Sequence, residues 1–201
     1  MKTKHGEYLE HLAKHDLQAV ANRRALRPDV CNFIEQVTLK KDVANVLEIG
    51  RATGHSFGFF RFLWPEAFIA SVDVLHSPVA DQVAALYDDN YIFIDGSSSK
   101  LEPVKTLFDV VLIDGDHSYE GIKADYEKYE PFVKENGLIL IHDVLWAHKG
   151  VKKFFWDKVK YPKSILPLSR SGMGVITKKF PPYYDQSKIK PFYRKYNYNK
   201  S

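Results

Sequence analysis

A turn framed by two glycines follows the first strongly apolar segment of the chain and could hold a nucleotide-like ligand. The stretch reads V-L-E-I-G-R-A-T-G over residues 46–54, and Gly50 and Gly54 frame its turn. A strand that ends in a turn of small residues presents backbone N–H groups to such ligands in α/β proteins. Asp73 follows about 20 residues after Gly54, where a carboxylate can accept hydrogen bonds from a ribose diol. These residues predict a cofactor site for NAD or S-adenosylmethionine, with Ala52 where such turns usually carry glycine.

Polar and acidic residues also stand at the ends of the other apolar segments. They are Glu48 and Gly50 in and after residues 45–49, Asp73 at 68–74, Asp95, Gly96, Ser97 and Ser98 after 91–94, Asp114, Asp116 and His117 after 108–113, and His142 and Asp143 after 138–141. Ligands of open parallel sheets bind outside the carboxyl ends of the strands, so these residues are predicted to gather at one edge. Helix capping would explain any one of them but explains the whole set poorly.

The elements that must position these residues alternate between apolar strands and amphipathic helices, which predicts a parallel sheet. Helices are expected at residues 7–25, 29–40, 55–64, 78–88, 118–134 and 148–160, with Ser118 as an N-cap and Asn136-Gly137 as a stop. The last apolar runs, 164–168 and 174–177, are joined too closely for a crossover helix and are therefore predicted to pair antiparallel. A closing antiparallel hairpin is not typical of an NAD dehydrogenase, which lowers the rank of that interpretation.

Composition favours one soluble domain. The chain has 201 residues, of which 45% are hydrophobic, and a net charge of +4, which is weak evidence for nucleic-acid binding. The single cysteine, Cys31, excludes an intramolecular disulfide framework and fits a reducing compartment. Since no stretch approaches the roughly 18 apolar residues of a membrane span, we expect a cytoplasmic protein without membrane association.

Several motifs resemble those of the class I S-adenosylmethionine-dependent methyltransferases over about residues 20–178. The shared features are E-I-G-x-A-x-G after the first strand, an acid that closes the second, and the terminal hairpin. The strings F-D-V-V-L-I-D-G-D-H-S-Y-E-G-I-K-A-D-Y, G-L-I-L-I-H-D-V and G-M-G-V-I-T resemble more narrowly the branch of the macrocin and cephalosporin-biosynthesis methyltransferases, methyltransferase family 24. This resemblance implies a Rossmann-like α/β sandwich with a mainly parallel seven-stranded sheet and a C-terminal antiparallel hairpin. From the chain length we expect a single domain over residues 1–178 that includes the N-terminal helices.

The resemblance also implies a division of the cofactor site. Gly50, Arg51 and Gly54 would line the methionine end, Asp73 would bind the ribose, Gly96, Ser97 and Ser98 would flank the adenine, and Glu48 and Asp114 would complete the set. Ser56 would lie near the cofactor carboxylate, or serve only as a helix cap.

Asp114, His142 and Asp143 correspond to the residues that hold a divalent cation in metal-using relatives of this family. Two carboxylates suit Mg²⁺, whereas an imidazole at position 142 favours Mn²⁺, Fe²⁺ or Zn²⁺. Alternatively, His142 acts without a metal. His117 stands where catechol-type relatives have a lysine that takes the proton of the substrate hydroxyl, so it is predicted to be the general base, with Asp114 and His142 as its catalytic partners.

The function favoured by this set is O-methylation of a small-molecule or sugar hydroxyl. Residues 179–201 form a basic, tyrosine-rich arm that would dock on its own domain or on a neighbouring subunit of a homo-oligomer. If this arm instead stacked bases, the protein would be a nucleic-acid methyltransferase. If the strand-end acids were only helix caps, it would be a non-catalytic cofactor-binding module. Trp146 and His148, within the variable stretch 144–152, would contact the acceptor or only pack.

Overall fold

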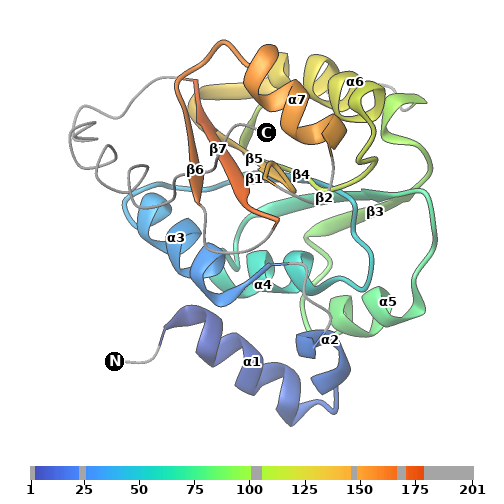
Figure 1. Ribbon diagram of the computed structural model, residues 1–201. Helices are drawn as coiled ribbons and strands as arrows, with labels where there is room; N and C mark the ends of the chain where they lie inside the picture. The colour runs from blue at the N-terminus through green and yellow to red at the C-terminus, as the bar shows by residue number, and fades with distance from the viewer. Residues whose placement is uncertain (1–2, 23–25, 101–105, 146–148, 167–170, 179–201) are drawn as a thin grey trace.

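A seven-stranded sheet between two layers of helices forms the framework of the protein in a computed structural model, which describes residues 3–22, 26–100, 106–145, 149–166 and 171–178 (Figure 1). The strands are β1 (Asn45–Ile49), β2 (Phe68–Asp73), β3 (Tyr91–Asp95), β4 (Phe108–Ile113), β5 (Val133–His142), β6 (Lys163–Leu166) and β7 (Met173–Thr177). Their order is β3-β2-β1-β4-β5-β7-β6, with β1 to β5 parallel and β7 antiparallel to both of its neighbours. The predicted parallel core and antiparallel hairpin are confirmed.

The register of the parallel strands brings their carboxyl ends to one edge. Ile49 of β1 pairs with Val72 of β2 and with Ile113 of β4, and Asp73 pairs with Asp95 of β3. The strand order reverses between β1 and β4, which makes this the switch point where open α/β sheets bind ligands. The loops that follow β1 and β4 therefore flank the expected site.

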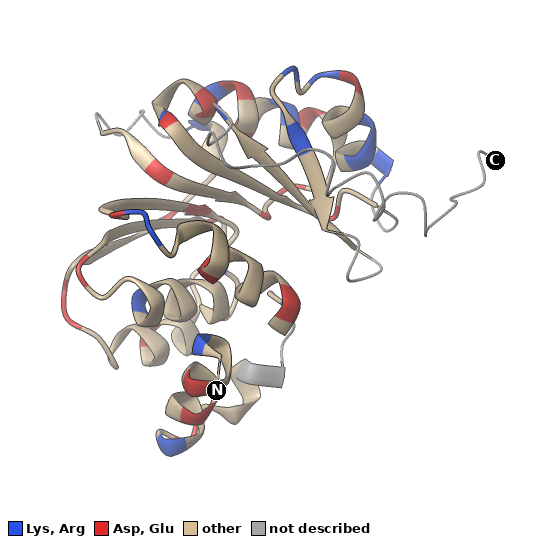
Figure 2. Ribbon diagram, turned by 90° about the vertical axis from the view of Figure 1, so that its left-hand side faces the viewer, with Lys and Arg blue, Asp and Glu red and all other residues tan. Residues whose placement is uncertain are grey.

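Helices cover both faces of the sheet. They are α1 (Lys4–Lys14), α2 (Gln18–Asn22), α3 (Pro28–Thr38), α4 (His55–Leu63), α5 (Pro78–Ala84), α6 (Tyr119–Tyr129) and α7 (Lys149–Asp157), with two short 3₁₀ turns, η1 (Ser98–Lys100) and η2 (Glu130–Phe132). Figure 1 shows α6 and α7 on one face and α3, α4 and α5 on the other, with α1 and α2 outside α4. Charged residues lie mainly on the helices and connections (Figure 2).

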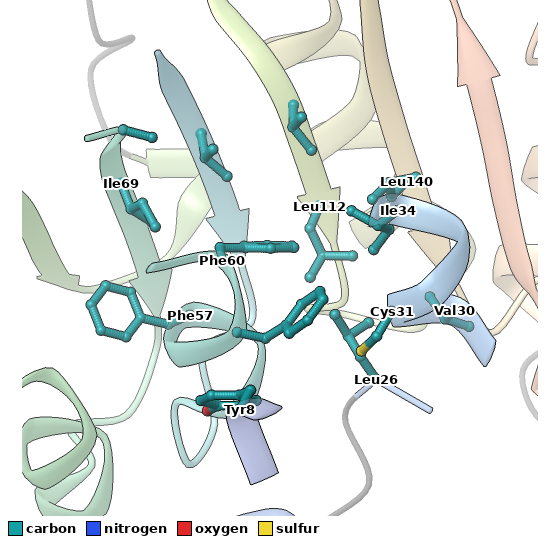
Figure 3. Close-up of a cluster of buried hydrophobic side chains, with 14 of the residues drawn as sticks. Tyr8, Leu26, Val30, Cys31, Ile34, Phe57, Phe60, Ile69, Leu112 and Leu140 are labelled. Atoms are coloured by element: carbon teal, nitrogen blue, oxygen red, sulfur yellow. The ribbon is translucent and has the colours of Figure 1, made fainter. Parts of the chain in front are cut away.

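Alternate residues of each strand feed two separate cores. Val46 of β1 packs with the helices α1, α3, α4 and α5, whereas its neighbour Leu47 packs with α6 and α7. Phe57 and Phe60 of α4 are fully buried in the first core, where they lie beneath Ile69 and Leu112 of the sheet (Figure 3). Each such side chain contributes roughly 1.5–3 kcal/mol by burial, so the cores fix the strands that carry the site.

Two predicted helices differ most from the structure. The expected helix 7–25 is divided into α1 and α2, because Asp16 adopts a left-handed conformation with φ of 59° between them. The expected helix 118–134 ends at Tyr129, because Pro131 cannot continue its hydrogen-bonding ladder, and Val133 already begins β5. Asn136-Gly137 therefore lies inside β5 and stops no helix.

The predicted N-cap at Ser118 is confirmed. Its hydroxyl accepts a hydrogen bond from the backbone N–H of Gly121 at 3.0 Å. The single cysteine, Cys31, is buried. In the part of the chain that the structure describes, no helix combines the length and apolarity needed to cross a bilayer. The arm 179–201 and residues Trp146 and His148 lie outside the described residues.

Candidate active site

The glycine-framed loop after β1 is held in an uncommon conformation. Gly50, Ala52 and Gly54 all have positive φ, of 94°, 46° and 79°. Glycine adopts such angles without steric cost, whereas the left-handed conformation costs an alanine such as Ala52 roughly 1–2 kcal/mol. The backbone N–H of Gly50 donates to the carbonyl of Val72 at 2.8 Å, which fixes the loop against the end of β2.

Asp73 lies beside this loop, as its predicted role requires. Its Oδ2 accepts a hydrogen bond from the backbone N–H of Ala52 at 2.8 Å, and its Oδ1 accepts one from Leu75 at 3.0 Å. The backbone N–H of Gly96 donates to the carbonyl of Asp73 at 2.7 Å. The loop, Asp73 and the turn after β3 thus form one continuous rim at the carboxyl edge of the sheet.

Three predicted cofactor residues turn their side chains into the protein. Glu48 is fully buried and accepts hydrogen bonds from the hydroxyls of Ser56 and Ser71. Burial raises the pKa of Glu48 to about 7, against the opposing effect of these two hydroxyls. Ser56 and Arg51 are also buried. These side chains support the loop from beneath, and only their backbone can face a ligand on the rim.

The turn after β3 is fastened to α6. Ser98 donates its hydroxyl hydrogen bond to Asp125, while Lys128 and Tyr129 donate to the carbonyl oxygen of Ser98 at 3.0 and 2.9 Å. The family resemblance implies that Ser97 and Ser98 flank the adenine, but it does not predict these anchors. Their spacing of three and four residues on one helix face is the signal that could have suggested a common target.

Two exposed apolar residues next to Asp73 were also missed. Val74 and Leu75 are 67% and 72% exposed, although they directly follow a buried strand. An apolar pair exposed beside a polar anchor is typical of a ligand surface. The signal in the sequence that could have identified these two residues is their position immediately after Asp73, the acid predicted to bind the ribose.

Two carboxylates and two histidines meet at the ends of β4 and β5. Nε2 of His117 lies 3.0 Å from Oδ2 of Asp143 and 3.5 Å from Oδ1 of Asp114. Nδ1 of His142 lies 3.0 Å from the same Oδ1 of Asp114 and 3.4 Å from Oδ1 of Asp143. The side chain of His117 is 36% exposed and that of His142 only 16%, so His117 faces the open side of the cluster. The structure brings all four predicted residues together.

The carboxylates of the cluster favour the charged form of both imidazoles. Hydrogen bonds to Asp114 and Asp143 raise the pKa of His117 to about 9. Burial alone would lower the pKa of His142, but its hydrogen bonds to the same carboxylates outweigh burial and raise the value to about 10. Burial likewise opposes ionisation of Asp143, but its two histidine partners hold the pKa of this carboxyl well below its usual range.

One group of side chains in the described residues has the arrangement of a cation site. The donor atoms of Asp114, His117 and Asp143 all lie within 4.8 Å of one another. This group contains His117 where sequence analysis expected His142, which contacts the same carboxylates from the buried side. Two carboxylates and one imidazole fit a divalent cation, and the nitrogen donor favours Mn²⁺, Fe²⁺ or Zn²⁺ over Mg²⁺.

A family model described as a methyltransferase domain matches residues 47–144. This span begins in β1 and includes both the rim and the cluster of Asp114, His117, His142 and Asp143. A search of curated protein sequences found no match. Residues 47–144 therefore match the sequence pattern of a methyltransferase domain, and the model is that of family 24, which the sequence motifs resemble.

Solved structures share the fold across most of the chain. A Staphylococcus aureus protein provisionally assigned as a caffeoyl-CoA O-methyltransferase has a TM-score of 0.66 and 20% identity, over 86% of this chain and 98% of its own. A Bacillus cereus O-methyltransferase, solved with S-adenosylhomocysteine, has a TM-score of 0.63 and 18% identity, over 86% and 91%. MycE, a methyltransferase of mycinamycin biosynthesis solved with Mg, S-adenosylhomocysteine and mycinamycin VI, has a TM-score of 0.59 and 16% identity, over 88% and 57%. The chain has the Rossmann-like fold of the class I methyltransferases, and together with the family match this fold supports an enzyme of that class.

Proposed function

We propose that this protein is an S-adenosylmethionine-dependent O-methyltransferase that methylates a hydroxyl of a small molecule or sugar, as in the macrocin and cephalosporin branch. The observation that carries the proposal is the meeting of two half-sites at the switch point of the sheet. The glycine-framed loop with Asp73 lies on one side, and the cluster of Asp114, His117 and Asp143 lies on the other.

The cofactor half offers a complementary partner for each part of S-adenosylmethionine. Backbone groups of residues 50–54 face the methionine end, and Asp73 accepts hydrogen bonds from the ribose hydroxyls. Val74 and Leu75 offer the adenine an apolar surface next to Gly96 and Ser97. The structural neighbours from Bacillus cereus and Podospora anserina were both solved with S-adenosylhomocysteine, which supports the same ligand here.

The acceptor half supplies a base for the methyl transfer. The reaction is an in-line displacement at the methyl carbon, so the acceptor hydroxyl must lose its proton as the new C–O bond forms. His117 is the exposed imidazole of the cluster, and Nε2 pairs with Asp143. This nitrogen acts as the base in the neutral imidazole, which forms when the imidazolium loses its Nε2 proton to solvent. His142 supports Asp114 from the buried side.

A divalent cation fits the same half-site. We propose Asp114 and Asp143 as its carboxylate ligands, with an imidazole of His142 or His117 as the nitrogen ligand. When bound there, the cation would lower the pKa of the acceptor hydroxyl and fix its direction. MycE, solved with Mg, is the structural neighbour that supports this assignment.

Calorimetric titration of the purified protein with S-adenosylmethionine and S-adenosylhomocysteine tests the proposal. We expect both to bind at a single site, and binding of neither would overturn it. Transfer of a labelled methyl group to a panel of phenols and sugars then tests the reaction type. Labelling of RNA or DNA but of no hydroxyl compound would replace the O-methyltransferase assignment with a nucleic-acid methyltransferase.

A further inference from the structure

The side chain of Arg51 points into the protein. It is only 1% exposed, although the residue belongs to the glycine-framed loop that forms part of the rim. Nη1 donates to the carbonyl oxygen of Ser71 in β2 at 3.1 Å, and Nη2 donates to Oδ1 of Asp95 at the end of β3 at 2.5 Å. The guanidinium also lies over the ring of Phe93, 4.2 Å from its centroid. Arg51 therefore connects the loop with the two neighbouring strands.

These contacts suit arginine and no other residue. Burying a charge is costly unless it is paired and hydrogen-bonded, and a planar guanidinium can bond two acceptors while it stacks on an aromatic ring. Its hydrogen bond to Asp95 is the main reason why the pKa of that carboxyl lies below its usual value. Lysine would carry the same charge but could not reach both acceptors and the ring in one geometry.

The connection continues along the rim beyond Asp95. Oδ2 of Asp95 lies 3.3 Å from Nδ1 of His76, and Nε2 of His76 lies 3.2 Å from Oδ2 of Asp81 in α5. This row of alternating basic and acidic side chains joins the loop after β1, the end of β3, the segment after β2 and the first turn of α5. Asp73 bonds to two of the segments that this row joins, through the backbone N–H groups of Ala52 and Leu75.

We propose that Arg51 is a positioning residue for the cofactor, which sets the separation between the glycine-framed loop and the turn after β3. The inference rests on the proposed function, since these two segments would hold the methionine and adenine ends of S-adenosylmethionine. The loop carries the donors for one end, and Asp95 is directly followed by Gly96 and Ser97 at the other. A shift of either segment by about 1 Å is enough to lower the affinity for a ligand that must contact both segments.

The chain contains a matched control for this role. Arg61 of α4 is 2% exposed, donates from Nη1 to the carbonyl of Ala67 at 2.7 Å, pairs through Nη2 with Asp88 and faces the ring of Tyr87. Its partners lie before β2 and β3, at the opposite edge of the sheet from the rim. Loss of either arginine removes the same kinds of contact, but only Arg51 reaches the proposed cofactor site.

The test compares Arg51→Met with Arg61→Met by calorimetry with S-adenosylhomocysteine and with methylthioadenosine. We expect similar losses in melting temperature, but affinity for S-adenosylhomocysteine about 10- to 100-fold weaker in Arg51→Met and within about twofold of wild type in Arg61→Met. Methylthioadenosine lacks the methionine end and need not contact both segments, so its affinity should fall much less in Arg51→Met. Arg51→Lys should recover part of the affinity, because it keeps the charge and one donor.

A second pair of variants leaves both buried arginines in place. Asp95→Asn and Asp88→Asn change the more exposed partners of the two arginines, and only Asp95→Asn should weaken the binding of S-adenosylhomocysteine. Adding Asp95→Asn to Arg51→Met should then cost little more affinity, since both act through one contact. Equal affinities in the Arg51 and Arg61 series would overturn the positioning role alone. Failure of the wild-type protein to bind either ligand would overturn the proposed function as well.

Discussion

Gly50 lies directly against the backbone of Asp114. A Cβ atom on Gly50 would come within 2.0 Å of the carbonyl oxygen of Asp114 and 2.5 Å of its carbonyl carbon. The backbone N–H of Asp114 also donates to the carbonyl of Ile49 at 2.8 Å. The first residue of the loop and the first acid of the cluster are thus in contact, so a change at one half-site displaces the other.

Gly50→Ala is expected to remove cofactor binding. The positive φ at this position costs an alanine of the order of 1–2 kcal/mol, and the clash with Asp114 adds to that cost. Calorimetry with S-adenosylmethionine and urea unfolding measure the two effects. Gly6→Ala in α1 is the control, because a Cβ there meets only the hydroxyl of Thr3 at 3.5 Å. If Gly50→Ala and Gly6→Ala have the same affinity for S-adenosylmethionine and the same stability in urea, the close contact between Gly50 and Asp114 is contradicted.

His117→Ala should reduce turnover by about 10²- to 10⁴-fold, the usual effect of losing a general base. The affinity for S-adenosylmethionine should remain close to that of wild type, because His117 pairs with Asp114 and Asp143 of the acceptor cluster. Steady-state rates of methyl transfer and calorimetry measure the two quantities. His15→Ala, at an exposed position after α1, provides the control. Undiminished turnover would remove His117 from the mechanism.

Asp73→Ala is expected to weaken S-adenosylmethionine binding by about 10- to 100-fold, the range for losing hydrogen bonds to a charged group. The variant also loses the contact from Ala52, so its melting temperature is needed to show that the domain remains folded. Asp42→Ala, at an exposed position before β1, controls for the loss of one negative charge. If calorimetry gives the same affinity for both variants, the ribose assignment is wrong.

Backbone features of the site could be predicted from the sequence, because they follow from local patterns. Apolar segments with a glycine or an acid at their ends located β1 to β4 closely, and parallel topology then required Asp73, Asp114 and His142 to share one edge. The start of β5 could not be found in this way. Residues 133–137, which precede its apolar run, contain a single large apolar residue, Val133. They belong to the strand because β5 pairs with β4, where Val133 lies opposite Phe108.

Side-chain directions were not predictable from the same patterns. Arg51 and Glu48 stand on the loop and on its strand, which suggested ligand contacts, but their partners Asp95 and Ser71 lie more than 20 residues away in the sequence. The pairing of His117 with Asp143 is equally remote. Such contacts depend on how the strands are ordered in space, and the spacing of residues along one chain does not contain this information.

Cation binding is expected to release protons. The raised pKa values of His117 and His142, about 9 and 10, keep both imidazoles protonated at neutral pH, and a cation between Asp114 and Asp143 would displace these protons. Affinity for Mn²⁺ should therefore increase from pH 6.5 to pH 9. Titrations in two buffers of different ionisation enthalpy measure the protons released, and Asp143→Asn should abolish the binding. Identical heats in both buffers would contradict the displacement.

Activity after chelation tests the catalytic role of such a cation separately. We expect turnover to fall in EDTA and to return with Mn²⁺ more fully than with Mg²⁺, because the site offers a nitrogen donor beside its carboxylates. Binding of S-adenosylhomocysteine should persist in EDTA, since the loop and Asp73 need no cation. Full turnover in EDTA would exclude a catalytic cation.

Glu48→Gln should change how stability depends on pH. Burial raises the pKa of Glu48 to about 7, so between its unfolded pKa of about 4.5 and pH 7 the folded state binds the extra proton. Its stabilising contribution is complete below pH 4.5 and is lost as the pH rises through 7, by at most about 1.4 kcal/mol per pH unit.

Glutamine keeps a carbonyl oxygen for Ser56 or Ser71 but cannot ionise, so the variant should gain stability relative to wild type between pH 5 and pH 7. Above pH 7 the difference should stay constant, because Glu48 is then ionised in both the folded and the unfolded state. Urea unfolding at pH 5, 6, 7 and 8 measures this difference, with the exposed Glu66→Gln as the control. Parallel pH curves for wild type and Glu48→Gln would mean that Glu48 ionises as readily in the folded protein as in the unfolded chain.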